Sequence, residues 1–363
     1  MAEAPWPITF DDVLAARERL RPHLQPTALR HYAALDQRVG GSIRVFVKHE
    51  NHNPTGAFKA RNGLAAVSAL TPEERGRGVV AASAGNHGLG LAHAGRIFGV
   101  RVVVCVPTTA NPEKVEAIRG LGADVVEHGQ DYGDAVERAA KLAGEQGLTL
   151  VHSTECRAVL AGAGTITLEM LEQQPGLEAI VVSLGGGSQA VGAMTVVRGL
   201  GRSIPVYAVQ AQGASVIHDS FRARRPLTAA AASVSTIADG LATRETYPLT
   251  FGALLDGLAD FLVVSEAEIA EAVRILIATT HNLVEPSGAV PRDCCFIGRA
   301  PLDQGDTNRK RRPLSSRARI DISLGMIYRW TVELPDFEDD PELANDQILS
   351  SIYQEWFEEV NSV

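Results

Sequence analysis

Strands and helices alternate along the middle of the chain, as the positions of its apolar residues indicate. Short apolar runs predict four strands, at residues 79–83, 100–106, 124–128 and 148–153. Helical spacing between these runs predicts three helices, one ending near Phe98 and two covering residues 111–121 and 131–146. Because strands that alternate with helices of this length form parallel sheets, we expect a small α/β domain over residues 80–152.

A second set of elements surrounds this domain in the sequence. The pattern predicts a helix through Val13 and Leu20, with Asp11 and Asp12 as caps, and then a strand at 43–48. Later elements are a helix at 165–173, a strand and glycine loop in AIVVSLGGGSQAVGAM, a strand at 206–210 and a helix at 265–282. These later elements form a second unit after the small α/β domain.

The sequence changes character after Ala289. Residues 291–320 hold eight basic residues against three Asp, and residues 331–363 hold ten acidic residues and no Lys or Arg. The first block lacks periodicity and is interpreted as loop or disorder. From Pro341 on, Ile348, Ile352, Trp356 and Val360 have the spacing of one amphipathic helix. Residues 291–363 are therefore an atypical tail and not a continuation of the α/β body.

Composition limits the classes of partner. The 363 residues carry a formal net charge of −9, which argues against binding nucleic acid or an anionic membrane through a basic surface. The four cysteines form no C-x-x-C pair and are too few for a disulfide scaffold, so we expect a reducing, cytoplasmic compartment. The first residues lack a signal-peptide pattern, and no apolar run of about 18 residues is present to span a membrane.

A lysine in the segment Pro54–Arg61 is the first candidate for chemistry. Lys59 follows a glycine-containing turn and lies between Phe58 and Ala60. Burial would lower the pKa of its amine, because the charged form is desolvated, and would make it a better nucleophile toward an aldehyde. The alternative is a lysine at the start of a helix whose charged end reaches water.

The segment Ser83–Gly88 follows a predicted strand and opens a predicted helix. Ligands of parallel sheets bind at the carboxyl ends of strands, and free N–H groups at a helix start suit a carboxylate. The amide of Asn86 can hydrogen-bond a ring hydroxyl. The alternative is an ordinary turn in which Asn and Gly supply left-handed conformations.

The segment Ser183–Gln189 also connects a predicted strand to a predicted helix. Its three consecutive glycines, Gly185, Gly186 and Gly187, can point several N–H groups at one anion, and the helix start adds positive charge. The segment matches neither glycine pattern of nucleotide-binding loops, so we interpret it as a site for a phosphate. The alternative is close packing of backbones.

Together the three segments require a cofactor with an aldehyde, a ring hydroxyl and a phosphate, and pyridoxal phosphate has all three. The sequence resembles the threonine and serine dehydratase branch of the fold-type II pyridoxal-phosphate enzymes, from about residue 15 to residue 290. The resemblance is carried by KHENHNPTGAFKAR, SAGNHG and SLGGGSQAVG, with further matches in AGAGTITLE, TIADGLA and EPSGA.

The resemblance implies two domains, a larger one of residues 1–79 and 153–290 and a smaller one of residues 80–152, each an open, mostly parallel twisted sheet flanked by helices. It also implies a role for each matching residue. Lys59 would bind the cofactor covalently and transfer the α-proton, Phe58 would lie beside the ring, and Asn86 would bond its 3′-oxygen. The phosphate would be held by Gly185, Gly186, Gly187 and Ser188. The substrate carboxylate would be bound by the loop of Ser83, Ala84, Gly85, Asn86 and His87, together with Thr55.

The implied reaction is β-elimination from L-threonine or L-serine, which yields a 2-oxo acid and ammonia, in a homodimer without nucleic-acid or membrane partners. Serine racemases carry an acid–base serine where this chain has Ala84, so dehydration is favoured over racemisation. Their divalent-cation site has no carboxylate counterpart at Gln210, Ala214 or Ser215, and we expect no metal. Lyases acting on another hydroxy amino acid, and a catalytically impaired homologue acting as an interaction protein, remain alternatives.

The chain departs from the family pattern after EPSGA. The family continues with a helix, a core strand and a Ser-Gly-Gly-Asn loop that bonds the pyridine nitrogen, and the sequence has no such motif. We therefore expect that a central strand of the larger domain is missing, that a sheet edge is exposed, and that the pyridine partner has no assigned residue.

Overall fold

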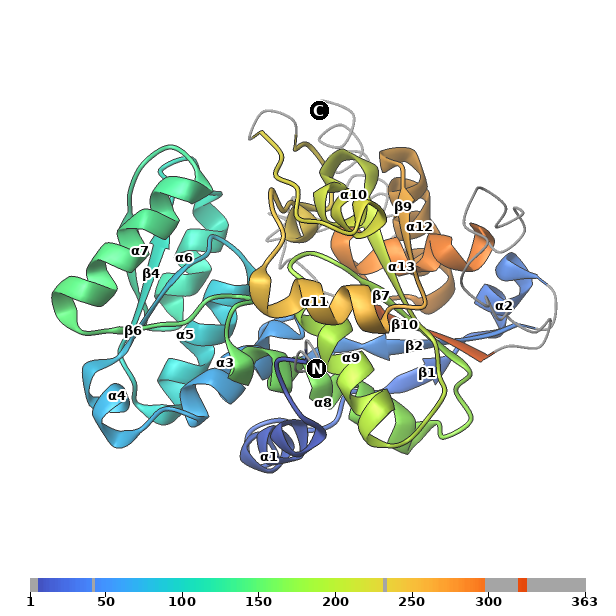
Figure 1. The fold of residues 1–363 in the computed structure, drawn as a ribbon, viewed down its shortest axis with the longest axis horizontal. Coiled ribbons are helices and arrows are strands. Elements are labelled where there is room, and N and C mark those ends of the chain that lie inside the picture. The colour runs from blue at the N-terminus through green and yellow to red at the C-terminus, as the bar shows by residue number, and fades with distance from the viewer. Residues whose placement is uncertain (1–5, 41–42, 231–233, 298–318, 325–363) are drawn as a thin grey trace, which may run out of the picture. The chain divides into compact units, whose positions relative to one another are not determined.

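Two separate β-sheets organise the part of the chain that the structure describes. The structure is a computed structural model, and it describes residues 6–40, 43–230, 234–297 and 319–324 (Figure 1). All of these belong to the first of two compact units, Met1–Ile327. The second unit, Tyr328–Val363, contains the helix predicted from Pro341 on and lies outside the described residues.

The larger sheet has six strands in the order β1-β2-β10-β7-β8-β9. Its strands are β1 (Leu29–His31), β2 (Arg44–His49), β7 (Ala179–Ser183), β8 (Val206–Ala211), β9 (Asp260–Val264) and β10 (Arg319–Leu324). Only the pairing of β1 with β2 is antiparallel, and every other pair is parallel. The carboxyl ends of the five parallel strands therefore open on one edge of this sheet.

The smaller sheet has four parallel strands in the order β5-β4-β3-β6. These strands are β3 (Val79–Ala82), β4 (Val102–Val106), β5 (Asp124–Glu127) and β6 (Thr149–Leu150). Val80, Val103 and Cys105 from the sheet pack against Ala139 and Leu142 of a covering helix in a buried apolar cluster. The division into domains at residues 80–152 stays a prediction, although this sheet falls almost entirely within that range.

Helices cover both sheets. They are α1 (Phe10–Leu20), α2 (Ala33–Val39), α3 (Lys59–Ser68), α4 (Pro72–Arg77), α5 (Asn86–Phe98), α6 (Pro112–Gly120), α7 (Tyr132–Gln146), α8 (Arg157–Gln173), α9 (Ser188–Gly199), α10 (Val216–Ala223), α11 (Pro248–Gly257), α12 (Glu266–Thr280) and α13 (Pro286–Ile297). Short 3₁₀ turns occur at Glu50–His52, Gln212–Ala214 and Asp239–Leu241. None of the described helices is both long and apolar enough to cross a bilayer.

Helices α3 and α5 meet backbone to backbone. A Cβ atom on Gly63 of α3 would lie 2.1 Å from the Gly90 carbonyl oxygen of α5, and one on Gly90 would lie 2.2 Å from the Lys59 carbonyl oxygen. Any larger side chain at either position would push the helices apart. The two glycines thus fix the start of α3 against α5.

Local sequence signals explain the starts of several of the described helices. Asp131 caps α7 and Ser265 caps α12, each in a reciprocal capping box with the residue three positions later. The expected caps of the first helix were wrong. Thr9 is the N-cap of α1, and Asp12 closes its capping box from inside the helix.

The expectation of a missing central strand was also wrong. Strand β10 lies between β2 and β7, parallel to both, so the larger sheet is continuous at that position. Helix α13 likewise extends to Ile297, inside the stretch that we interpreted as loop or disorder. The local sequence does not reveal β10, because the strand is held by pairing with β2 and β7, which lie more than a hundred residues earlier in the chain.

Candidate active site

Two of the three candidate segments follow strands at the points where the direction of strand order reverses. In the smaller sheet the chain steps from β3 to β4 and β5, and then returns to β6 on the other side of β3. In the larger sheet it steps from β7 to β8 and β9, and then returns to β10 on the other side of β7. Loops diverge at such points and leave room for a ligand. The loops that begin at Ser83 and Leu184 both lie there.

Lys59 is the first residue of α3, and its amine is held without a carboxylate partner among the described residues. The amine donates a hydrogen bond to the Ser153 carbonyl oxygen at 3.3 Å and lies 5.0 Å from the centre of the Phe58 ring. Burial lowers the pKa of Lys59 to about 8. About a tenth of the amine is therefore uncharged at pH 7, and attack on an aldehyde requires this neutral form.

The loop before α5 keeps several backbone donors free. The Ser83 hydroxyl oxygen accepts hydrogen bonds from the N–H groups of Gly85, at 3.2 Å, and Gly88, at 3.0 Å. In the described part of the chain, the N–H groups of Ala84, Asn86 and His87 donate to nothing. Ser83 thus shapes the loop, and these three N–H groups are left to bind an anion.

The glycine loop after β7 leaves no room for side chains. A Cβ on Gly186 would lie 2.0 Å from the Thr154 hydroxyl oxygen, and one on Gly185 would lie 2.9 Å from the Gly240 carbonyl oxygen. Gly187 has a φ of 99°, in the left-handed region, and is the N-cap of α9. The N–H groups of these three glycines make no hydrogen bond within the described residues. Together with the start of α9 they form a cradle for an anion.

Contacts through residues 153 and 154 bring the lysine and the glycine loop together. Ser153 accepts the hydrogen bond of the Lys59 amine, and the side chain of the next residue, Thr154, lies against Gly186. On the other side, Gly240 lies against Gly185 and donates its N–H to the Ser287 hydroxyl at 3.0 Å.

Glu285 joins this arrangement to the asparagine loop. The Asn86 side-chain amide donates to the Glu285 carboxylate at 3.3 Å, and the Asn86 Oδ1 atom is buried without a partner among the described residues. Burial raises the pKa of Glu285 to about 7, against smaller opposing effects of Asn86 and Lys114. Because Ser287 also contacts Gly240, the segment EPSGA connects the asparagine loop to the glycine loop.

A group of aromatic and histidine side chains beside Lys59 was missed by sequence reasoning. The His152 and Tyr247 rings lie 5.3 Å apart, and His152 accepts hydrogen bonds at Nδ1 from the N–H groups of Thr154 and Glu155. Burial lowers the pKa of His152 and raises those of Tyr132 and Tyr247. The sequence signal for His152 is its position, two residues after the end of β6.

The His87 ring also lies near the Lys59 amine. Its Nε2–H donates to the Val151 carbonyl oxygen at 2.9 Å, while Nδ1 is buried and has no partner among the described residues. Burial, and then the nearby charge of Lys59, lowers the pKa of His87 to about 3. The ring is therefore neutral, and Nδ1 can only accept a hydrogen bond.

A buried ionic cluster fixes the segment that carries Lys59. Arg61 makes ion pairs with Glu50 at 2.7 Å and with Glu169 at 2.6 Å, and Lys48 pairs with Glu169 at 2.7 Å. Thr27 donates its hydroxyl to Glu50 at 2.6 Å. Two positive and two negative groups balance inside the fold, so the first turn of α3 is held by directional bonds.

The expected absence of a metal site stays a prediction. Gln210 is fully buried, donates to the Thr243 hydroxyl at 3.2 Å and accepts from the His218 N–H at 3.1 Å. No group of three or more His, Cys, Asp or Glu side chains in the described ranges could hold a metal ion.

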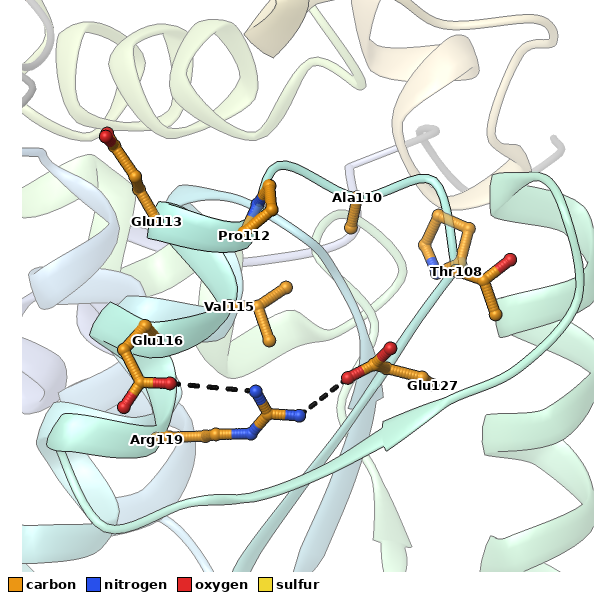
Figure 2. Close-up of a pocket in the computed structure, with 9 residues that line it drawn as sticks. Thr108, Ala110, Pro112, Glu113, Val115, Glu116, Arg119 and Glu127 are labelled. Carbon is orange, nitrogen blue, oxygen red and sulfur yellow. Dashed lines mark hydrogen bonds and ion pairs between the residues drawn. The ribbon is translucent and has the colours of Figure 1, made fainter.

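A surface depression at the carboxyl ends of β4 and β5 is separate from these contacts. Figure 2 shows it beside α6, with Arg119 between the carboxylates of Glu116 and Glu127. Its volume is about 440 Å³. Lys59, Asn86 and the glycine loop do not line it, and it plays no part in the candidate site.

The residues present fit pyridoxal phosphate. The Gly185–Gly187 cradle suits its phosphate, the weakly basic Lys59 suits its aldehyde, and the Asn86 amide suits its ring oxygen. The Thr55 hydroxyl is buried and has no partner among the described residues. The individual roles of these residues stay predictions. The residue that bonds the pyridine nitrogen stays unassigned, and the residues after Leu324 lie outside the described ranges.

Comparisons with known proteins agree with this fit. Residues 20–306 match the family described as pyridoxal-phosphate dependent enzymes. The L-threonine ammonia-lyase of Thermotoga maritima is 35% identical over 283 residues, which cover 78% of this chain and 70% of that protein.

Solved structures show the same fold. The threonine deaminase of T.th. has a TM-score of 0.79 and 30% identity, with 90% of this chain and all (100%) of that chain covered. The serine racemase of Dictyostelium discoideum has a TM-score of 0.77 and 28% identity, with 88% and 98% covered. The architecture is therefore that of the fold-type II enzymes.

The end of the chain matches a different family. Residues 320–361 match proteins described as iron–sulphur cluster assembly. The similarity thus changes between residues 306 and 320, just before β10.

Proposed function

The chain belongs to the family of pyridoxal-phosphate-dependent enzymes, and we propose that it is a lyase that dehydrates and deaminates L-threonine to 2-oxobutanoate and ammonia. The observation that carries this proposal is the set of contacts that joins Lys59, the Asn86 loop and the glycine loop around one space. Similarity to proteins named threonine ammonia-lyase and threonine deaminase supports the substrate.

Each part of the site has a task in this reaction. The N–H groups of Gly185, Gly186 and Gly187 hold the phosphate of the cofactor. The free N–H groups of Ala84, Asn86 and His87 bind the carboxylate of the substrate, which orients its α-carbon. Bound pyridoxal phosphate supplies the electron sink that makes the α-proton acidic.

Lys59 moves the proton. Its amine has a pKa of about 8, so at neutral pH it exchanges a proton readily with a neighbouring group. It accepts the α-proton at Nζ, and the Ser153 carbonyl oxygen then accepts a hydrogen bond from the charged amine. Positioned acid–base groups of this kind contribute about 10²–10⁴ in rate.

The side chain at position 84 favours elimination over racemisation. Racemisation needs a second acid–base group on the other face of the α-carbon, and Ala84 has none. A Cβ on the neighbouring Gly85 would meet no atom within 4 Å, so the loop is open on this side. This chain thus shares the fold of serine racemase, but position 84 carries no acid–base group.

Three finer features belong to the proposal. L-serine is a second substrate, since it differs from L-threonine by one methyl group. The protein acts as a homodimer in the cytoplasm. Its free thiols Cys105 and Cys156 suit a reducing compartment.

The test is turnover by the purified protein loaded with pyridoxal phosphate. We expect an absorption band of the bound cofactor that changes when L-threonine is added, together with formation of 2-oxobutanoate. Lys59→Ala should abolish both. Lys141→Ala, which removes an exposed lysine of α7, is the matched control and should leave turnover unchanged. Turnover by Lys59→Ala at the parent rate would contradict the proposal.

A further inference from the structure

The side chain of Glu285 determines how the Asn86 amide is oriented in the candidate site. The Asn86 Nδ2 atom donates to the Glu285 carboxylate at 3.3 Å, and the Asn86 Oδ1 atom is buried with no partner among the described residues. One end of the amide is therefore held by the protein, and the other end is left for a ligand. Because α5 meets α3 backbone to backbone, the side chain and not the helix has to adapt to that ligand.

An amide and a carboxyl group can be paired in two ways. A carboxylate only accepts hydrogen bonds, so ionised Glu285 faces the Asn86 NH2 group and leaves Oδ1 toward the ligand. A protonated carboxyl group has an O–H donor, so protonated Glu285 can donate to Oδ1 after the amide has turned over. The NH2 group of Asn86 then faces the ligand. The proton on Glu285 thus selects whether Asn86 presents an acceptor or a donor.

The ring oxygen of pyridoxal phosphate needs a donor. Its hydroxyl is more acidic than that of tyrosine because the pyridine ring withdraws electrons, and the ionised oxygen can only accept hydrogen bonds. An ionised ring oxygen that faced Oδ1 would place two acceptors together, and a turned amide would repel an ionised Glu285 in the same way. Every contact is satisfied when Asn86 donates to the ring oxygen and Glu285 carries a proton.

The surroundings of Glu285 allow its neutral form. Burial raises the pKa of the carboxyl group to about 7. The charged groups that act on it are Lys114 of α6 and Asp239 of the turn Asp239–Leu241. These two form an ion pair at 3.0 Å, so their opposite effects on Glu285 offset each other. A proton on Glu285 therefore costs little free energy near neutral pH.

We propose that Glu285 is a positioning residue, which takes up a proton when the cofactor binds and so lets the Asn86 amide turn its NH2 group to the ring oxygen. The inference rests on the cofactor site of the proposed function and adds a residue that acts through Asn86. One proton moves from solvent to the Glu285 carboxylate, and the bond from Nδ2 to Glu285 breaks. Bonds from the Glu285 O–H to Oδ1 and from Nδ2 to the ring oxygen form in its place.

Proton uptake on binding tests this proposal without any measurement of turnover. The probe is 4-deoxypyridoxine 5′-phosphate, which keeps the ring hydroxyl and the phosphate but has no aldehyde to react with Lys59. Calorimetry in buffers of different ionisation enthalpy gives the number of protons taken up. At pH 8 the free carboxyl group is about nine-tenths ionised, so the parent should take up about 0.9 proton more than Glu285→Gln. Above pH 7 the Kd of the parent should rise by up to about tenfold more per pH unit than that of Glu285→Gln.

A second variant tests whether Glu285 acts through Asn86. In Asn86→Ala the uptake should fall to the level of Glu285→Gln, because no amide connects the carboxyl group to the ring oxygen. Glu145→Gln makes the same change on the exposed side of α7 and should match the parent. Equal uptake by the parent and Glu285→Gln, or full uptake by Asn86→Ala, would overturn the proposal. Either result with binding intact leaves the proposed function standing, whereas failure of the parent to bind the probe would overturn both.

Discussion

Gly186→Ala should abolish tight binding of pyridoxal phosphate and leave the fold intact. The new Cβ would lie 2.0 Å from the Thr154 hydroxyl oxygen, 2.9 Å from its Cβ and 3.0 Å from its Cγ2. Ordinary contacts between such atoms need about 3.5 Å, so one partner must move by more than about 1 Å. Thr154 is only 3% exposed and cannot turn into solvent. The glycine loop has to move instead.

The size of the effect follows from the donors that the loop supplies. One N–H bond to a charged group contributes about 1.5–3 kcal/mol. Loss of a single bond therefore raises the Kd for pyridoxal phosphate by about 10–100-fold, and loss of two multiplies these factors. Titration of the protein with pyridoxal phosphate, followed by absorbance, measures this Kd directly.

Two further variants distinguish displacement of the glycine loop from a general loss of stability. Gly144→Ala lies inside α7, where a Cβ meets no atom within 4 Å, and should leave the Kd unchanged. Adding Thr154→Ala to Gly186→Ala removes two of the three close atoms and should recover part of the affinity. If Gly186→Ala binds the cofactor within threefold of the parent, while its Tm is also unchanged, the glycine loop does not hold the phosphate.

Other predictions concern charge and pH. Since Lys59 reacts as the neutral amine, the rate at which pyridoxal phosphate attaches should rise about tenfold per pH unit up to about pH 8 and then level off; a flat stopped-flow profile from pH 6 to 9 would contradict this. The pKa of Glu285 is about 7 in the folded chain against an ordinary 4.5, so the unfolded chain loses its proton first and stability falls as pH rises between these values. In Glu285→Gln this decline in Tm should be smaller, and an equal decline would refute the assignment. Arg61→Ala leaves the buried Glu50 carboxylate without an ion-pair partner and Glu169 with Lys48 alone, and should cost about 3–5 kcal/mol in urea unfolding. The exposed Arg101→Ala should cost less than about 1 kcal/mol, and equal costs would count against the buried cluster.

The sequence was sufficient for the elements whose apolar spacing is regular. The strands near residues 79, 102 and 124 and the helices capped by Asn111, Asp131 and Ser265 lie close to their expected places. Helix α8 begins at Arg157 and not near residue 165, because its first turns are buried alanine, leucine and glycine without a polar face to set the period. Strand β6 is shorter than expected, since the chain leaves the sheet after Leu150 to place His152 and Ser153 beside Lys59.

The site was predictable where the chemistry is local and not where it depends on distant partners. Three short segments identified Lys59, Asn86 and the glycine loop, because each type of residue suits one part of a single cofactor. The raised pKa of Glu285 and the free Nδ1 of His87 arise from burial, which no spacing along the chain reveals. The role of Ser83 in binding substrate stays a prediction, and the structure adds that its hydroxyl oxygen accepts from two N–H groups of its own loop.

The backbone contact between Gly63 and Gly90 has a mechanical consequence. With no side chain between α3 and α5, the helices cannot slide or tilt against each other without a collision of main-chain atoms. The reactive amine of Lys59 and the amide of Asn86, at the first residues of these helices, therefore travel as one rigid body. If the site opens to admit a cofactor, we therefore expect the movement to separate this pair of helices from the glycine loop and not the two helices from each other.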